Sequence, residues 1–171
     1  AAKQYTGLSV LQIDAHADLR ESYEGTPYSH ACAMRLASRH VQKIVGVGIR
    51  SLSAEEAAFA EAHPEIRLHF DHERRQKSDW IPRALEGLSD TVYLTVDIDG
   101  LDPSLIPATG TPEPGGLSWY ETLSLIRAVF AEKRVVAADL VELLPRSGFH
   151  SADFAAAKLV YKMIGYWKES A

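Results

Sequence analysis

Short runs of apolar residues alternate with amphipathic stretches along the whole chain, and this alternation predicts its elements. Runs of five to eight residues rich in Val, Ile and Leu, too short for helices, indicate buried strands. These strands are expected at residues 8–13, 43–49, 66–70, 91–96 and 134–141. Helices are expected at residues 29–38, after Ser53, and at 79–86, 118–133 and 151–167.

Two of the predicted helix starts carry a further signal. Ser53 is followed three residues later by Glu56, and Ser118 by Glu121, which is the capping-box pattern of a helix N-terminus. Strands that alternate with helices imply right-handed βαβ units and a three-layer αβα fold with a mostly parallel sheet. No repeat, low-complexity tract or linker interrupts the pattern, so residues 1–171 are expected to form a single domain.

Acidic residues gather where two of the predicted strands end. The first strand runs into Asp14, His16 and Asp18, and the fourth ends at Asp97 and Asp99. In an extended chain, residues two and four apart point the same way, so each group should converge. An Asp in such a place often caps a helix or meets solvent, but four carboxylates in one site would repel one another without a cation. The set predicts a metal site, and its oxygen-rich chemistry favours a hard metal such as Mn²⁺.

The shared site also constrains the order of the strands. If both acidic groups bind one metal centre, the first and fourth strands must be neighbours. The second and third strands then lie on one side of them and the fifth on the other, which predicts the order 5-4-1-2-3. The site falls at the topological switch point, where open α/β sheets bind their ligands.

Three sequence blocks resemble those of one enzyme family. DAHADLRESYEG with the later SHA, DIDGLDPSLIPATGTPEPGGL, and DLVELLP look like the signature blocks of the arginase/agmatinase (ureohydrolase) family, in the family's order and across essentially the whole chain. Members of that family hydrolyse a guanidino group to urea and an amine, with two Mn²⁺ ions that share a bridging hydroxide. The resemblance implies that Asp14 and Asp97 each bridge the two ions. Asp18 would bind one ion, and His16 and Asp99 the other.

The same resemblance suggests roles for residues outside the metal set. His30 would carry protons between solvent, hydroxide and the leaving amine, a task suited to a group that titrates near neutral pH. Glu142 would pair with the substrate guanidinium, and Thr111 would help to position it. Without the resemblance, the simpler interpretations are a solvated first-turn histidine, a solvated loop acid and a Pro/Gly turn.

The identity of the guanidino compound stays open at this point. The loop at residues 19–25 looks like the bacterial and archaeal agmatinase version rather than the arginase version. Agmatine, hydrolysed to putrescine and urea, is therefore the first expectation, and aminopropylagmatine and arginine are alternatives. Glu24 and Glu113 are candidates to meet a distal amine, although both also read as ordinary surface acids.

Composition supports a small cationic substrate and argues against other partners. The net charge is −5, whereas nucleic acids and anionic membranes require a basic face. Apolar residues make up 46% and charged residues 24%, as in ordinary globular proteins, and no apolar run approaches the roughly 20 residues that span a bilayer. Cys32 is the single cysteine, so no internal disulfide can form and a cytoplasmic location is expected.

The pattern departs from the family at its beginning. A further metal ligand, a His in a Gly-Gly-Asp-His segment upstream of the first acidic group, has no counterpart, so an N-terminally truncated domain with one metal ligand missing is expected. The fifth strand would leave an open sheet edge, which favours a homo-oligomer. A non-catalytic homologue that acts through assembly is therefore an alternative function. A metal-dependent deacetylase is a weaker rival, because the GTGTPEPGG and VELLP blocks fit it less well.

Overall fold

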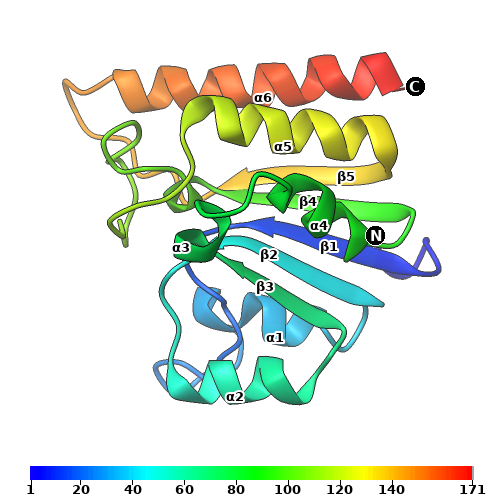
Figure 1. Ribbon diagram of the computed structural model, residues 1–171. Helices are drawn as coiled ribbons and strands as arrows, with labels where there is room; N and C mark the ends of the chain where they lie inside the picture. Colours follow the sequence, from blue (N-terminus) through cyan, green and yellow to red (C-terminus); the bar gives the residue numbers. More distant parts are fainter. Residues whose placement is uncertain (171) are drawn as a thin grey trace.

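The computed structural model describes residues 1–170, which form a parallel five-stranded sheet between two layers of helices (Figure 1). The strands lie in the order β3-β2-β1-β4-β5, so the predicted order is confirmed. Their bounds are β1 (Leu8–Ile13), β2 (Lys43–Ile49), β3 (Ile66–Phe70), β4 (Thr91–Asp97) and β5 (Arg134–Val141).

The helices divide between the two faces of the sheet. One face packs against α4 (Trp80–Glu86), α5 (Trp119–Glu132) and α6 (Ser151–Ser170), and the other against α1 (Ala33–Ala37) and α2 (Ala54–Ala62). In Figure 1, α5 and α6 lie above the sheet and α1 and α2 below it. The predicted three-layer αβα fold is confirmed.

The ends of the helices follow the capping signals in the sequence. The side chains of Ser53 and Ser118 each accept a hydrogen bond from the backbone N–H of the glutamate three residues on. The carboxylate of that glutamate accepts one from the serine backbone N–H, so both capping boxes are formed. The short elements η1 (His30–Cys32), α3 (Asp71–Arg74) and η2 (Ile98–Gly100) were not predicted separately. Elements of three or four residues lack a periodicity that a sequence pattern could reveal.

The side chains of the strands alternate between two apolar clusters. Leu11, Val45 and Leu94 face the α4–α5–α6 layer, whereas Val10 and Ile44 face α1 and α2. Fully burying a residue of this size stabilises the fold by about 1.5–3 kcal/mol. Because helices cover both faces of the sheet, the strand sequences are continuous apolar runs rather than alternating ones.

One part of the sheet is less completely covered. The face of β4 and β5 opposite α5 borders a cavity of about 790 Å³, lined on these strands by Tyr93, Thr95 and Asp139. The outer edge of β5 has no partner strand within residues 1–170. In the same part of the chain, no helix is both long and apolar enough to cross a membrane.

Gly100 provides a direct test of the packing between β1 and η2. A Cβ atom at this position would lie 2.7 Å from the backbone nitrogen of Asp14 and 3.0 Å from its Cα atom. We expect Gly100→Ala to lower the free energy of unfolding by about 1–3 kcal/mol, because the backbone has to move to relieve the clash. The measurement is equilibrium unfolding in urea.

The matched control is Gly165→Ala in the exposed part of α6, where an added Cβ atom meets nothing within 4 Å. That change should stabilise the protein by up to about 1 kcal/mol, since alanine is the better helix former. Equal effects of the two substitutions would show that the contact between Gly100 and Asp14 is not tight.

Candidate metal centre

The site lies where β1 and β4 end side by side in the middle of the sheet. These strands pair from Leu8–Thr91 to Ile13–Val96, so their carboxyl ends are level with each other. The backbone N–H of Asp14 donates to the carbonyl of Val47 on β2, 3.1 Å away, and continues the sheet for one more residue. The acidic residues that follow β1 and β4 therefore enter the same space.

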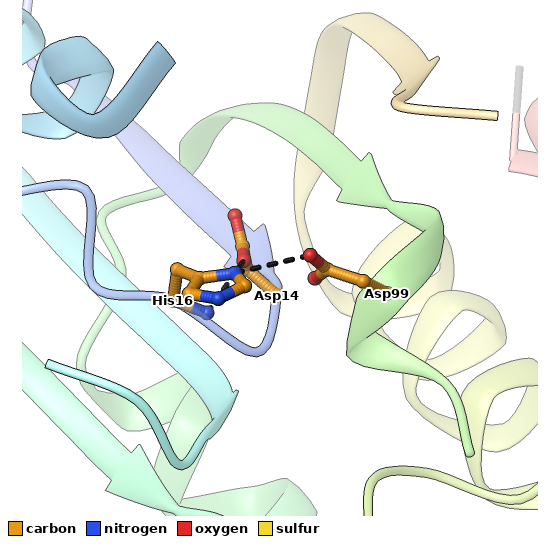
Figure 2. A group of neighbouring side chains, drawn as sticks. All are labelled: Asp14, His16 and Asp99. Atoms are coloured by element: carbon orange, nitrogen blue, oxygen red, sulfur yellow. Dashed lines mark hydrogen bonds and ion pairs between the residues drawn. The ribbon is translucent and has the colours of Figure 1, made fainter. Parts of the chain in front are cut away.

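Three side chains form the centre of this site. Asp14, His16 and Asp99 each offer a ligand atom, and these atoms all lie within 4.8 Å of one another (Figure 2). His16 Nδ1 lies 3.0 Å from Asp99 Oδ2 and 3.6 Å from Asp14 Oδ1. Asp14 and Asp99 are only 4% and 3% exposed, so their charges are removed from water.

Asp18 and Asp97, the other predicted ligands, line the cavity that contains this cluster. Asp97 Oδ1 also accepts a hydrogen bond from the backbone N–H of Asp99, 2.9 Å away. All five predicted ligands thus border one cavity, although Asp14, His16 and Asp99 alone form the compact group among the described residues.

The backbone route to this arrangement differs from the extended one that was predicted. Asp18 has φ +55°, and Asp99 lies in the 3-10 turn η2 rather than in a continued strand. His16 stays beside the sheet through a single bridge to Ser51. The predicted alternation along an extended chain is therefore wrong for Asp18 and Asp99, whereas Asp14 and His16 lie together as it predicted. Asp18 and Asp99 reach the same cavity through a left-handed residue and a 3-10 turn instead.

The electrostatics of the site show the cost of gathering acids in a buried place. Burial, together with the charges of Asp14 and Asp99, raises the pKa of Asp97 to about 9. Burial and the charge of Asp14 raise the pKa of Asp18 to about 8. Hydrogen bonds to Asp14 and Asp99 raise the pKa of His16 to about 10.

Asp99 behaves differently from its neighbours. Burial alone would raise its pKa, but hydrogen bonds from His16 and from the backbone N–H of Ala15 hold it below the usual range. The Ala15 nitrogen lies 3.0 Å from Asp99 Oδ1. Asp99 is therefore held ionised, which a cation ligand requires.

This donor set fits a divalent cation. Carboxylate oxygens and one imidazole are ligands that Mn²⁺ and similar metals accept, and no thiolate is among them. The protons held by Asp18, Asp97 and His16 relieve the same repulsion that a cation would relieve. The residues present can therefore hold a metal in place of those protons.

Gln12 is a site residue that the sequence did not reveal. It is fully buried in β1, and its Nε2 atom donates to Asp14 Oδ2 at 2.9 Å and to the carbonyl of His16 at 3.1 Å. This hydrogen bond orients the Asp14 carboxylate, as outer hydrogen bonds commonly do for metal ligands. A polar residue in the apolar run LSVLQI was the available signal.

Glu56 supports the loop from the other side. This buried residue caps α2, and its Oε1 atom also accepts from the backbone N–H of Leu19, 3.0 Å away. The carbonyl of Asp18 accepts hydrogen bonds from the N–H groups of Met34 and Arg35 at 3.1 Å. The peptide unit after Asp18 is thus fixed at both its polar atoms, which maintains the left-handed conformation of that residue.

Three of the other predicted residues line the cavity, namely His30, Thr111 and Glu142. His30 and Glu142 line it and are exposed, and Glu142 has φ +62°. The hydroxyl of Thr111 donates to Asp99 Oδ2 over 3.4 Å. Glu113 Oε1 lies 3.8 Å from His16 Nε2, so this residue stands beside the cluster. Glu24 is exposed and is not among the residues that line the cavity.

The fold and the site define a three-layer α/β protein. At the topological switch point of its sheet lies an acidic group of residues that could hold a metal ion. The sequence model of the Arginase family matches residues 1–165, and the chain belongs to this family. Membership decides against the alternative of an unrelated deacetylase.

Several curated relatives are similar over nearly the whole chain. The N(1)-aminopropylagmatine ureohydrolase of Synechocystis is 41% identical over 163 residues, which cover 95% of this chain and 53% of that protein. The agmatinase of Pyrococcus horikoshii is 34% identical over 157 residues, covering 92% of this chain and 54% of that protein. The chain thus spans about half the length of these relatives.

Solved structures show the same fold. The agmatine ureohydrolase of Thermoplasma volcanium superposes with a TM-score of 0.84 at 31% identity, over 95% of this chain and 56% of the other. The arginase of Bacillus subtilis gives a TM-score of 0.86 at 26% identity, over 96% of this chain and 65% of the other. The similarity therefore extends through the strands and helices that position the site.

Metal binding should release protons from this site. Near pH 7, His16, Asp97 and Asp18, with pKa values of about 10, 9 and 8, hold protons that a bound cation must displace. We therefore expect affinity for Mn²⁺ to rise as the pH rises from about 7 to 9. Calorimetric titration in two buffers of different ionisation enthalpy measures the proton release. Binding without proton release, or affinity that falls with rising pH, would contradict this protonation pattern.

Glu56 provides a test of the loop support. Glu56→Ala would leave the buried N–H of Leu19 without an acceptor, and we expect it to cost about 1–3 kcal/mol of unfolding free energy. Glu56→Gln should recover part of this loss. Its single amide oxygen can accept from the N–H of Leu19 or of Ser53, whereas the two carboxylate oxygens of Glu56 accept from both. The exposed neighbour Glu55→Ala is the control and should change little. A loss no larger than that of the control would show that Glu56 does not hold the loop.

Proposed function

We propose that this chain carries a ureohydrolase site, which hydrolyses a guanidino group to urea and an amine with the aid of Mn²⁺. The observation that carries the proposal is the group of Asp14, His16 and Asp99, which lines a large cavity and has both carboxylates buried, in a member of the Arginase family. Two divalent cations bound there would act as Lewis acids and make a water nucleophilic near neutral pH. Asp18 and Asp97 would complete their ligands.

The residues around the cavity have distinct tasks in this proposal. Glu142 pairs with the guanidinium, for which a carboxylate offers two parallel acceptors. Thr111, already hydrogen-bonded to Asp99, holds a guanidino nitrogen near the cluster. His30 is exposed at the cavity wall and can exchange protons with solvent, so it delivers a proton to the leaving amine.

The substrate in this proposal is a guanidino compound with an amine at its far end. Agmatine is the first candidate. Aminopropylagmatine is the second candidate. Its support is that two relatives named for it are each 41% identical to this chain, whereas the agmatinase of P. horikoshii is 34% identical. Glu113 would add negative charge beside His16 for a cationic substrate. Comparing kcat/KM for the two compounds distinguishes the candidates.

A function through assembly is the second class of proposal. The unpaired outer edge of β5 in residues 1–170 supports it, since open edges of this kind pair readily with another chain. A homo-oligomer joined at β5 would cover that edge. Light scattering after size-exclusion chromatography would show the mass of the assembly. Assembly without urea release, in the presence of Mn²⁺, would favour this function over catalysis.

Two substitutions test the catalytic proposal through urea release with Mn²⁺ added. Asp97→Ala should abolish activity and reduce bound Mn²⁺, because a metal ligand is lost. His30→Ala should slow turnover by about 10²–10⁴-fold while sparing the metal, as expected for a proton carrier. Metal content is measured by elemental analysis. Equal loss of metal in both variants would show that the roles are misassigned, and wild-type protein that binds Mn²⁺ but releases no urea would refute catalysis.

A further inference from the structure

The loop between η2 and α5 needs an external support. Residues 109–115 make no backbone–backbone hydrogen bond within the described part of the chain. Nevertheless this segment carries Thr111, which contacts Asp99, and Glu113, which lies beside His16. Something other than secondary structure must therefore fix its position.

Arg50, at the end of β2, supplies that support. Its guanidinium donates to the carbonyls of Asp99 at 2.7 Å, Glu113 at 2.9 Å, Pro114 at 3.0 Å and Gly48 at 3.1 Å. A guanidinium has five N–H donors in a rigid plane, which suits several fixed acceptors at once. The same nitrogen, Nη2, holds both Asp99 and Glu113, so one side chain joins a predicted metal ligand to the loop.

Gly115 and Gly116 let the loop approach this closely. Their φ angles are +90° and +105°, and a Cβ atom on Gly116 would lie 2.9 Å from Arg50 Nη2 and 2.8 Å from the carbonyl carbon of Leu101. Asp71 holds the far end, because its Oδ2 atom accepts from the N–H of Gly116 at 3.1 Å. Gly116 is thus explained by its close approach to Arg50, and Gly115 by its positive φ and its place beside Asp71 Oδ2.

We propose that Arg50 is a positioning residue that sets the distance between the metal ligand Asp99 and the substrate-facing loop of Thr111 and Glu113. Its side-chain hydrogen bonds all go to carbonyls, so it acts through the backbone, and it is not among the residues that line the cavity. The substrate side of this inference rests on the proposed function, whereas the link between Asp99 and the loop does not.

The test compares Arg50→Met and Arg50→Lys with the surface control Arg83→Met. The Arg83 side chain bonds only to Asp79, the N-cap residue of α4, within the described residues, and both side chains are more than half exposed. Cleavage by proteinase K within residues 107–116, mapped by mass spectrometry, reports the position of the loop. We expect cleavage on the order of ten-fold faster in both Arg50 variants and unchanged in the control.

A second readout is the affinity for Mn²⁺, which we expect to fall about 10–100-fold in both Arg50 variants, as it does when outer supports of metal ligands are removed. Lysine should not restore it, because one ammonium cannot reach these separate carbonyls. Faster cleavage over the whole chain, full rescue by lysine, or a loop as resistant as wild type would overturn the inference. If the wild type binds no Mn²⁺, the proposed function fails, but the cleavage pattern still decides the role of Arg50.

Discussion

The concentration of negative charge at the ends of β1 and β4 is the constraint on which the rest of the site depends. Asp14, Asp97 and Asp99 are buried close together, and burial raises the pKa of Asp97 to about 9. Such a group is stable only with protons or a cation among the carboxylates. The parallel sheet makes the arrangement possible. Its apolar strands place two acidic loops at one edge, and the carboxylates of those loops take no part in the pairing of the strands.

The elements around the acids hold them by hydrogen bonds rather than by apolar packing. Gln12 orients Asp14, Glu56 fixes the peptide after Asp18, and Arg50 joins the backbone of Asp99 to the neighbouring loop. Each of these side chains is polar and wholly or partly buried, and each restrains a predicted ligand or its loop by hydrogen bonds. The loops of the site thus have defined conformations although they contain little regular structure.

The cavity lies on the side of the sheet that β4 and β5 form. It extends from the acidic cluster along the open face of β4 and β5, where the hydroxyl of Tyr93 donates to Asp139. A cationic substrate would find carboxylates at the inner end and exposed His30 and Glu142 at its wall. The proposals on substrate and assembly both concern this side of the sheet.

The sequence by itself determined the strands, their order and the place of the acidic residues. Apolar runs such as LSVLQI report a strand buried on both faces, and Asp14 and Asp97 directly follow or end such runs. Family resemblance in the same blocks indicated the chemistry. Only the tertiary structure decided how the predicted ligands converge, since Asp18 takes a left-handed conformation and Asp99 lies in a 3-10 turn. It also decided which residues support the site. Glu56 accepts a hydrogen bond from Leu19, 37 residues away in the sequence, and Arg50 donates one to Asp99, 49 residues away. A local pattern encodes periodicity and capping, but contacts at such separations exist only after the crossover connections have brought the segments together.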